Sequence, residues 1–429
     1  MQASPARITS SLAGVFLMQT VTTSSMDELK TGWKYLVAAM VGCGLGVSSL
    51  PIYTAGVFFP ALIAEYGWSR SQLSFAVLLF TLSIGVASPI VGRAIDRFGP
   101  VRCAAVSIIS AVVLYLVLAR FVNSLAGFYA VHVLIALLGA AAAPVAYTKV
   151  IAGHFSRMKG LAMGITLMGP SVVATVAPAI VATSIDDTNW RAGYIALAVM
   201  MAIVLPFLLL LRGQGDGVQA AQAAPEDDNG AFTEAERRNI FRLLITGLAL
   251  FSLGIGSLIV HLSPMLIDAG LEPVTAAGIV GFLGISGMAG RLIGGWLADR
   301  IFAAYILVGV SLSAALGCLA LAMVGASVAI PATIAIGFSL GVEADLMGYL
   351  VSRYFRRSDY SKVYGWQYAA FIGAVGISPL IMARIFDSLG NYQLGLFLNV
   401  VLLTMAAAVF RVLPRYDKPA AVRSFASAG

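Results

Sequence analysis

Long apolar runs occupy most of this sequence, and they constrain its fold more than any other feature. Each run has roughly 18 or more mostly apolar residues, enough for a helix to cross the hydrocarbon core of a bilayer. Backbone groups in that core must find hydrogen bonds within the chain, so the runs predict an all-α membrane bundle. The twelve predicted spans are residues 34–62, 72–91, 102–120, 125–151, 160–184, 192–211, 243–267, 275–297, 303–324, 330–351, 363–386 and 392–412.

The overall composition agrees with a membrane protein and excludes several other classes. Hydrophobic residues make up 59% and charged residues only 11%, whereas a soluble domain carries about 25% charged residues. The three cysteines, Cys43, Cys103 and Cys318, are far apart in apolar context. Their spacing matches no metal site or disulfide, so we expect packing residues. No phosphate-binding loop and no nucleophile–base spacing occurs, so we expect neither an enzyme nor a bound cofactor.

The basic residues predict an orientation in the membrane. With the N-terminus inside, few of the 27 Lys and Arg residues fall on the outer loops and helix ends, namely Arg70, Arg120, Arg191 and Arg384. Basic residues gather on the cytoplasmic side of membrane proteins. We therefore expect both termini in the cytoplasm and a multi-pass protein of the cell inner (plasma) membrane. The net charge of +7 should attract anionic lipid, and no basic, aromatic-interleaved patch indicates nucleic acid binding.

Two short motifs recur at nearly one offset. Residues 92–99 read GRAIDRFG, and residues 295–300 read GWLADR, so Gly92 and Gly295 are 203 positions apart. Residues 154–157 (HFSR) and 354–357 (YFRR) are offset by 200. Two unrelated motifs repeated at one spacing indicate a duplicated half. In a membrane protein, repeated halves are typical of a transporter with its site between them.

The repeat divides the chain into two six-helix bundles, residues 33–212 and 241–413. A polar linker, 213–240, joins them, and cytoplasmic tails cover 1–32 and 414–429. Thr233 and Glu236 near the end of the linker have capping-box spacing, which predicts a helix start. No signal peptide is predicted in the first tail. A start of translation at Met26, which would make residues 1–25 non-native, is an alternative.

The recurring charged turn is predicted to be a conformational latch rather than a ligand site. Arg93 and Arg97 lie near the end of a helix, where cations are favoured. Asp96 either pairs with them or caps a neighbouring helix. We expect the latch to hold in one conformation and to release in another. Its predicted members are Gly92, Arg93, Asp96, Arg97, Gly99, Gly295, Asp299 and Arg300.

This turn resembles the cytoplasmic loop signature of the major facilitator superfamily, with a weaker copy in the second half. Residues 154–164, followed by Gly169-Pro170, resemble the helix 5 signature of the monocarboxylate transporter and oxalate–formate exchanger branch. A drug-exporter signature also uses Gly-Pro here, but residues 171–173 lack its glycines. The resemblance implies twelve helices in two halves that rock about a central site.

Arg291 is the residue most strongly predicted to bind a substrate. It precedes Asp299 by eight positions, about 12 Å along a helix, and Ser88 stands at the equivalent place in the first half. A guanidinium binds a carboxylate bidentately. The monocarboxylate transporters carry a helix 8 arginine, which implies the same role. They usually have an aspartate one turn earlier, here Gly287, and often a helix 1 lysine, where this chain has Pro51-Ile52-Tyr53. A structural ion pair or snorkelling of Arg291 is the alternative.

Two acidic residues lie at a similar predicted depth. Glu343 and Asp345 precede Arg353 by ten and eight positions, about 15 and 12 Å. Alanine and valine stand at the equivalent first-half positions, Ala143 and Val145. Residues two apart point to nearly opposite sides of a helix. We therefore expect one acid to pair with a basic residue of helix 8 or its loop and the other to carry a proton. Buried ion-pair packing is the alternative.

The remaining site residues are predicted from their chemistry. His261, before Ser263-Pro264, carries a proton or contacts substrate, or is a packing residue. Tyr53 follows Pro51 in an irregular first span whose kink lines a cavity or serves packing. Gln367 and Tyr368 orient a ligand or pack. The similar exchangers carry a lysine in this helix, but 368–376 has none, which favours a monoanion. His132 is expected to pack and Lys149 to snorkel.

Together these features predict a secondary active transporter of a small organic monocarboxylate. We expect proton-coupled symport by alternating access in a monomeric unit, with Arg291 binding the anion and His261, Glu343 or Asp345 carrying the proton. The alternatives are proton-driven efflux of amphipathic compounds, anion exchange, and a signalling or scaffold protein without flux. The charged latches argue against the last, because a static protein does not need a contact that releases.

Overall fold

The computed structural model describes residues 25–155, 159–185, 189–211, 232–298, 300–356 and 359–416. Within those ranges the chain forms helices and no extended strand. Ten described segments are long and apolar enough to cross a membrane. They are Arg70–Ser88, Pro100–Phe121, Leu125–Ile151, Ala162–Ser184, Trp190–Leu210, Glu234–Asp268, Pro273–Ala298, Ala303–Tyr354, Val363–Leu389 and Gln393–Arg411.

These ten segments agree with the twelve predicted spans, because one of them contains two crossings and another crossing is broken. The segment from Ala303 to Tyr354 comprises α14 (Ala303–Val324), η3 (Gly325–Val328) and α15 (Ala329–Tyr354). The first crossing comprises α1 (Ser25–Gly44), α2 (Leu50–Thr54), η1 (Ala55–Phe58) and α3 (Phe59–Tyr66). Pro51 and Pro60 stand in the first turns of α2 and α3, where proline is tolerated because the backbone N–H has no helical partner. The predicted irregularity of this span is therefore confirmed.

The other helices follow the predicted spans in order. In the first half they are α4 (Arg70–Phe98), α5 (Pro100–Phe121), α6 (Leu125–Gly139), η2 (Ala140–Ala142), α7 (Pro144–His154), α8 (Lys159–Leu167), α9 (Gly169–Ser184), α10 (Trp190–Ala202) and α11 (Val204–Leu210). In the second half they are α12 (Glu234–Asp268), α13 (Pro273–Ala298), α16 (Tyr360–Leu389) and α17 (Gln393–Arg411). The predicted capping box is confirmed: the Thr233 hydroxyl accepts from the Glu236 backbone N–H at the start of α12.

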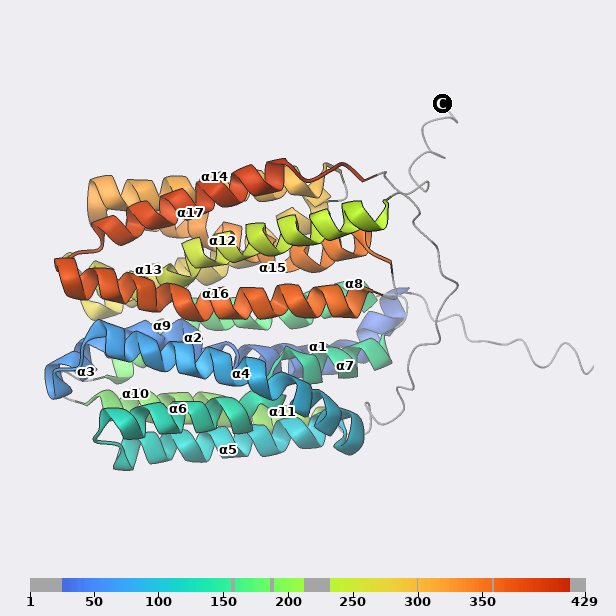
Figure 1. Ribbon diagram of the computed structural model, residues 1–429. Helices are drawn as coiled ribbons and strands as arrows, with labels where there is room; N and C mark the ends of the chain where they lie inside the picture. The colour runs from blue at the N-terminus through green and yellow to red at the C-terminus, as the bar shows by residue number, and fades with distance from the viewer. Residues whose placement is uncertain are drawn as a thin grey trace, which may run out of the picture.

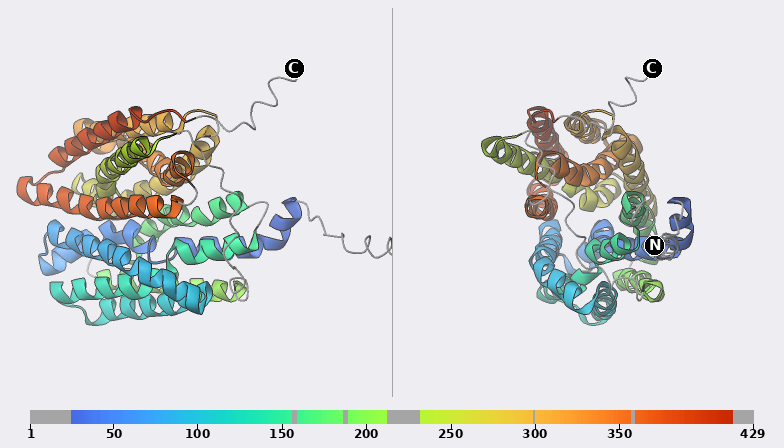
Figure 2. Two further views of the ribbon diagram at one scale, coloured as in Figure 1. Left: turned by 45° about the vertical axis from the view of Figure 1, so that its right-hand side comes forward. Right: turned by 90° about the vertical axis from the view of Figure 1, so that its right-hand side faces the viewer.

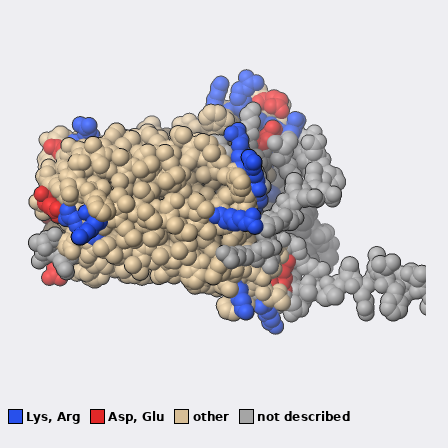
Figure 3. All heavy atoms as spheres, turned by 90° about the horizontal axis from the view of Figure 1, so that it is seen from below, with Lys and Arg blue, Asp and Glu red and all other residues tan. Residues whose placement is uncertain are grey.

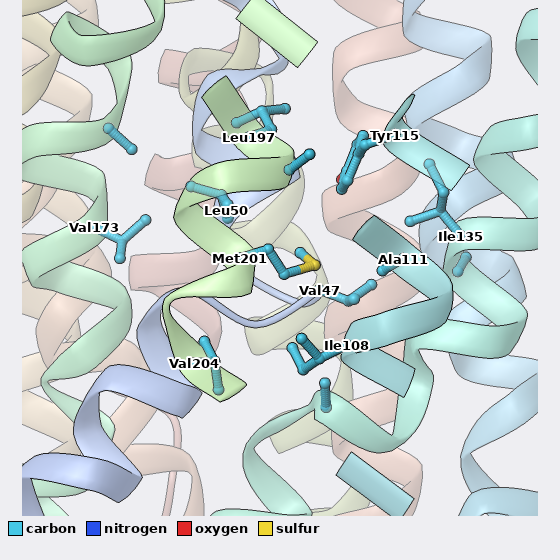
Figure 4. Close-up of a cluster of buried hydrophobic side chains, with 14 of the residues drawn as sticks. Val47, Leu50, Ile108, Ala111, Tyr115, Ile135, Val173, Leu197, Met201 and Val204 are labelled. Carbon is cyan, nitrogen blue, oxygen red and sulfur yellow. The ribbon is translucent and has the colours of Figure 1, made fainter. Parts of the chain in front are cut away.

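Two hydrophobic cores underlie the two halves. One runs from Leu36 to Leu211 and adds Val260 and Ala277 from the second half, and the other runs from Ile240 to Leu413. Figure 1 shows the halves as two layers, α1 to α11 below and α12 to α17 above. Figure 4 shows part of the first core, where Val47 and Leu50 meet Ile108, Tyr115 and Met201. The chain therefore buries apolar surface separately in each half.

The main contacts between the halves are α4 with α16, α9 with α13, and both α2 and η1 with α12. At the α9–α13 crossing, a Cβ atom on Gly284 would lie 2.2 Å from the Ser171 carbonyl oxygen. Only glycine fits there, and such close backbone approach is typical of helix packing in membranes. Both further views show the two halves side by side (Figure 2).

The bundle has two distinct ends. We call the end where α1 begins and α17 finishes the terminus end, and the end with α3 and the α16–α17 turn the opposite end (Figure 1). On the face shown in Figure 3, Lys, Arg, Asp and Glu gather at the two ends, and the band between them lacks these residues. Large apolar side chains such as Val86, Leu316 and Met323 are at least 66% exposed. This is the surface expected of a bundle surrounded by lipid tails.

Candidate functional site

An ion pair between two helices of the second half is the central feature of the candidate site. Arg291 Nη1 on α13 lies 2.5 Å from Asp345 Oδ1 on α15. Their side chains are 16% and 34% exposed, and Arg291 Nε has no hydrogen-bond partner in the described ranges. A guanidinium offers five N–H donors. Asp345 therefore occupies only part of the binding capacity of Arg291.

Close packing of α13 on α15 brings this pair together. A Cβ atom on Gly341 of α15 would lie 2.1 Å from the carbonyl oxygen of Gly287 on α13, so the backbones touch. One turn beyond this crossing lie Arg291 and Asp345, each four residues after its glycine. Gly287 is the position where the family resemblance implies an aspartate. Here the carboxylate beside the arginine comes from α15 instead.

Arg291 is also close enough to the first half for its charge to act there. Its charge acts on the Cys43 thiol of α1 and on the Tyr53 hydroxyl of α2. Cys43 in turn interacts electrostatically with the Tyr368 hydroxyl of α16. Arg291 is thus near enough to Tyr53, and Tyr368 near enough to Cys43, to interact electrostatically across the boundary between the halves.

Glu343 lies on the same helix as Asp345 but in different surroundings. Its side chain is 1% exposed, and its Oε1 accepts a 2.7 Å hydrogen bond from the Ser252 hydroxyl of α12. Its Oε2 has no hydrogen-bond partner, and no cation pairs with it, in the described ranges. Side chains two residues apart on a helix point in nearly opposite directions. This explains why Asp345 meets a cation while Glu343, among the described residues, does not.

Gln367 is buried within the second half. Its side chain is fully buried, and neither its amide nitrogen nor its amide oxygen has a partner among the described residues. Its neighbour Tyr368 stacks between Tyr364 and Phe371, with ring centroids 6.4 and 6.1 Å apart. Tyr368 therefore both packs and reaches the region of Arg291, whereas Gln367 keeps two unused hydrogen-bonding groups.

His261 belongs to a second cluster, away from Arg291. It lies seven residues before the end of α12 at the opposite end, about 10 Å along the axis, while Arg291 lies 18 residues into α13 from the same end, about 27 Å. His261 Nε2 is 2.9 Å from the Pro379 carbonyl oxygen and 3.1 Å from the Ser74 hydroxyl. The structure therefore separates the predicted proton residue His261 from the predicted anion residue.

The cluster around His261 closes the opposite end between the halves. Arg70, in the first turn of α4, forms an ion pair of 2.6 Å with Asp268 at the end of α12. The same guanidinium donates to the Tyr392 hydroxyl and lies 4.0 Å from the centre of the Phe386 ring. The Ser71 backbone N–H donates to Asp387 at 3.0 Å. This network joins α4 of the first half to three elements of the second half.

This network was not predicted from the sequence, where Arg70 is only one of the outer basic residues. A signal was present, because a cation in the first turn of a helix is disfavoured by the helix dipole and needs a partner. Ser69 forms a capping box with Gln72, which places Arg70 at that first turn. Asp268 is 198 positions away, so its identity as the partner depends on the tertiary fold.

The predicted latch at the terminus end lies partly outside what the structure describes. This holds for Asp299 and for the side chain of Asp96. Gly99 has a φ of 86°, a left-handed conformation that favours glycine at the α4–α5 turn. Arg93 and Arg97 are exposed, and Arg300 donates to the Trp296 carbonyl oxygen at 2.9 Å. The release of these turns during a conformational change remains a prediction.

His132 packs, as predicted, and Lys149 stays a predicted snorkelling residue. His132 Nδ1 lies 2.8 Å from the Phe128 carbonyl oxygen one turn earlier, and its ring packs 4.2 Å from the Phe128 ring, centre to centre. Lys149 is half-buried in α7 near the terminus end. No group of three or more His, Cys, Asp or Glu residues that could hold a metal ion occurs in the described part of the chain.

Two helical halves, an ion pair within the second half and a closed opposite end are features expected of a membrane transporter. The family model of the Major Facilitator Superfamily matches residues 41–347. The chain belongs to this superfamily and is a multi-pass membrane transporter, not an enzyme.

Individual relatives agree with this assignment. The chain is 26% identical to monocarboxylate transporter 13 of Bos taurus over 278 residues, which is 63% of this chain and 62% of that protein. It is 27% identical to monocarboxylate transporter 11 of Mus musculus over 275 residues, 63% of this chain and 60% of that protein. The match thus spans less than two thirds of each relative. Its similarity to these proteins agrees with the resemblance found in the helix 5 motif.

A solved structure shows the same fold. A bacterial homologue of the human lysosomal transporter Spinster superposes with a TM-score of 0.68 at 15% identity, covering 93% of this chain and all of that one. At this identity the likeness concerns the fold alone. The predicted twelve-helix architecture in two pseudo-repeated bundles is confirmed.

Proposed function

We propose that the protein transports a small organic monocarboxylate together with a proton, by alternating access of the two halves. The observation that carries this proposal is the Arg291–Asp345 ion pair. The charge of Arg291 acts on Tyr53 of the other half, and its Nε has no hydrogen-bond partner among the described residues. A substrate carboxylate can bind this guanidinium bidentately in place of Asp345, while Tyr53 and Tyr368 offer hydroxyl groups to orient it.

Substrate and Asp345 compete for Arg291 in this mechanism. An incoming carboxylate that pairs with Arg291 leaves the Asp345 carboxylate without its cation. An unpaired carboxylate at this depth is costly, so Asp345 takes up one proton and becomes a neutral acid. The site then carries one anion and one additional proton, and its net charge is unchanged. Release of the substrate on the other side returns Asp345 to Arg291 and frees the proton.

The internal partner of Arg291 favours symport over exchange. An exchanger needs a second substrate to accompany the return of its empty site. Here Asp345 neutralises Arg291 when no substrate is bound, so the halves can return without one. Glu343 is assigned a different role, because its carboxyl group has no cation partner among the described residues and is held by Ser252. We assign it to packing as a neutral acid, and the proton to Asp345.

Orientation and closure complete the proposal. The terminus end is assigned to the cytoplasm of a cell inner membrane, since basic residues concentrate there. The Arg70–Asp268 network then closes the outer side. His261 links Ser74 to Pro379 within this network, and its role is to hold the outer closure rather than to touch the substrate. The charged turns around Asp96 and Asp299 close the cytoplasmic side in the other state, and a monomer is sufficient for the cycle.

Uptake into proteoliposomes tests this proposal. A panel of monocarboxylates and dicarboxylates would be measured with and without an inward proton gradient, for wild type, Arg291→Gln and Arg384→Gln. The control changes an exposed arginine at the opposite end. We expect uptake of a monocarboxylate that the gradient stimulates, that Arg291→Gln abolishes and that Arg384→Gln retains. Gradient-driven extrusion of uncharged amphipathic compounds that Arg291→Gln leaves intact would instead favour the efflux alternative.

A further inference from the structure

A cluster of arginines and tyrosines lies at the terminus end of the second half, away from the transport site. It consists of Arg353 at the end of α15, Arg411 at the end of α17, Arg415 and Tyr416 just beyond it, and Tyr305 in the first turn of α14. Arg411 and Arg415 lie 5.4 and 5.6 Å from the centre of the Tyr305 ring. Arg353 lies 4.8 Å from the centre of the Tyr416 ring. Three cations thus share one aromatic surface.

Phe302 makes this surface continuous. Its ring centre is 5.2 Å from that of Tyr305 and 5.1 Å from that of Tyr416. The Tyr416 hydroxyl accepts from the backbone N–H of Ala303, the first residue of α14. The ends of α14, α15 and α17 therefore meet at the arginine–tyrosine cluster.

The three arginines have no acidic partner in the described ranges. Ion pairs there use Arg70, Arg191, Arg291 and Arg356 instead. Arg415 donates to the Tyr305 hydroxyl at 3.0 Å, and Arg353 Nε is buried without a partner. A guanidinium has five donors, and the described residues supply only one hydrogen-bond acceptor to these three arginines, the Tyr305 hydroxyl. Three concentrated positive charges with donors to spare are suited to an anion.

We propose that the arginine–tyrosine cluster binds the phosphodiester of an anionic glycerophospholipid. Guanidinium groups match phosphate oxygens bidentately, and basic pockets between helix ends are suited to anionic head groups. Arg411 is the last residue of the apolar segment Gln393–Arg411. The cluster therefore lies at the depth where the hydrocarbon region ends and lipid phosphates begin.

An exposed apolar face identifies a lipid rather than a soluble phosphate. Leu312, Leu316 and Met323 are 42%, 66% and 70% exposed. They follow Tyr305 on α14 by seven, eleven and eighteen residues, spacings that place all four on one face of the helix. An acyl chain that descends from a phosphate at Tyr305 would run along this face. A free phosphate ion would use the arginines but not the leucines.

Thermal unfolding of the purified full chain in a neutral detergent tests the inference. The midpoint would be measured alone, with phosphatidylglycerol, with phosphatidylcholine and with inorganic phosphate. Wild type would be compared with the Arg411→Gln/Arg415→Gln double variant and with Arg384→Gln at the opposite end. We expect phosphatidylglycerol to raise the midpoint of wild type and of Arg384→Gln. We expect the double variant to lose at least half of that rise, and the other two additives to have little effect.

Three results would overturn the inference. One is a phosphatidylglycerol shift in the double variant equal to that of wild type. Arg411 would then serve only to complement the dipole at the C-terminal end of α17. Another is an equal shift from inorganic phosphate, which would identify a soluble anion. The third is no lipid shift in wild type. If the double variant does not fold, Tyr305→Phe replaces it, because it keeps the ring and removes only the hydroxyl that Arg415 contacts. That variant should lose part of the shift, and an undiminished shift would count against the inference.

Discussion

Asp345 pairs with Arg291 across the α13–α15 crossing, with 2.5 Å between Oδ1 and Nη1. In this state the cation that we assign to the substrate already holds an internal carboxylate. A substrate that competes for this cation must change the protonation of Asp345, because a free carboxylate at this depth is costly. In the proposed mechanism, the pairing of these two residues connects substrate binding to proton uptake.

Replacement of Arg291 by lysine tests whether bidentate hydrogen bonding by the guanidinium matters, or only its positive charge. Arg291→Lys keeps the charge but cannot bind a carboxylate bidentately. Loss of one charge-assisted hydrogen bond costs about 1.5 kcal/mol, and roughly 1.4 kcal/mol corresponds to tenfold in affinity. We expect the KM for the monocarboxylate to rise at least about tenfold. An unchanged KM in uptake assays would show that Arg291 acts only as a charge.

Gly341 should tolerate no side chain. A Cβ atom there would lie 2.1 Å from the Gly287 carbonyl oxygen, so Gly341→Ala forces α13 and α15 apart. Overpacking of this kind costs about 1–3 kcal/mol, and the Arg291–Asp345 pair should loosen. Gly365→Ala on α16 is the matched control, because nothing lies within 4 Å of its added Cβ atom. We expect a lower unfolding midpoint and slower uptake for Gly341→Ala only, and equal behaviour of the two variants would be inconsistent with the close crossing.

Removal of the outer ion pair should open the closed end more often. Asp268→Asn leaves Arg70 without its carboxylate and weakens the contact between α4 and α12. A cysteine introduced at buried Ser74, in a background without native cysteines, reports on opening through labelling by a membrane-impermeant maleimide. We expect faster labelling with Asp268→Asn. Glu65→Gln, which breaks the Arg191–Glu65 pair within the first half, should leave the labelling rate unchanged. Equal rates in all three proteins would argue against the network as an outer closure.

Glu343 should tolerate an uncharged isostere. Glu343→Gln retains a carbonyl oxygen for the Ser252 hydroxyl, and within the described part of the chain the carboxyl group has no cation to lose. We expect gradient-stimulated uptake to stay within about threefold of wild type, a difference below about 1 kcal/mol. Ser252→Ala should lower stability by about 1 kcal/mol, because it removes a buried hydrogen bond. Loss of gradient stimulation in Glu343→Gln would move the proton site from Asp345 to Glu343.

The depth of the charged side chains in the membrane was predictable from the sequence, whereas the identity of their partners was not. The helical rise places Arg291 and Asp345 at the same predicted depth, and the structure pairs them. Which of the two acids on α15 meets the arginine depends on the rotation of the helix at the glycine crossing. That rotation is a property of two packed helices. The sequence alone therefore did not decide whether Glu343 or Asp345 pairs with a basic residue.

The cluster around His261 illustrates the other limit. His261 was predicted to contact substrate or carry a proton from its titration range alone. Its neighbours Ser74 and Pro379 are 187 and 118 positions away, and they place it with Arg70 rather than with Arg291. The broken first span, by contrast, was visible in the prolines themselves, because their local effect on the backbone needs no tertiary partner.

Uptake by Asp345→Asn tests the central claim most directly. The variant is neutral at position 345 whatever the pH, so it cannot exchange a proton as substrate arrives, and Arg291 stays free to bind the anion. In proteoliposomes we expect substrate exchange without a gradient to persist, and stimulation of net uptake by an inward proton gradient to disappear. Gradient-stimulated net uptake equal to that of wild type would contradict the assignment of the proton to Asp345 and the competition on which the account rests.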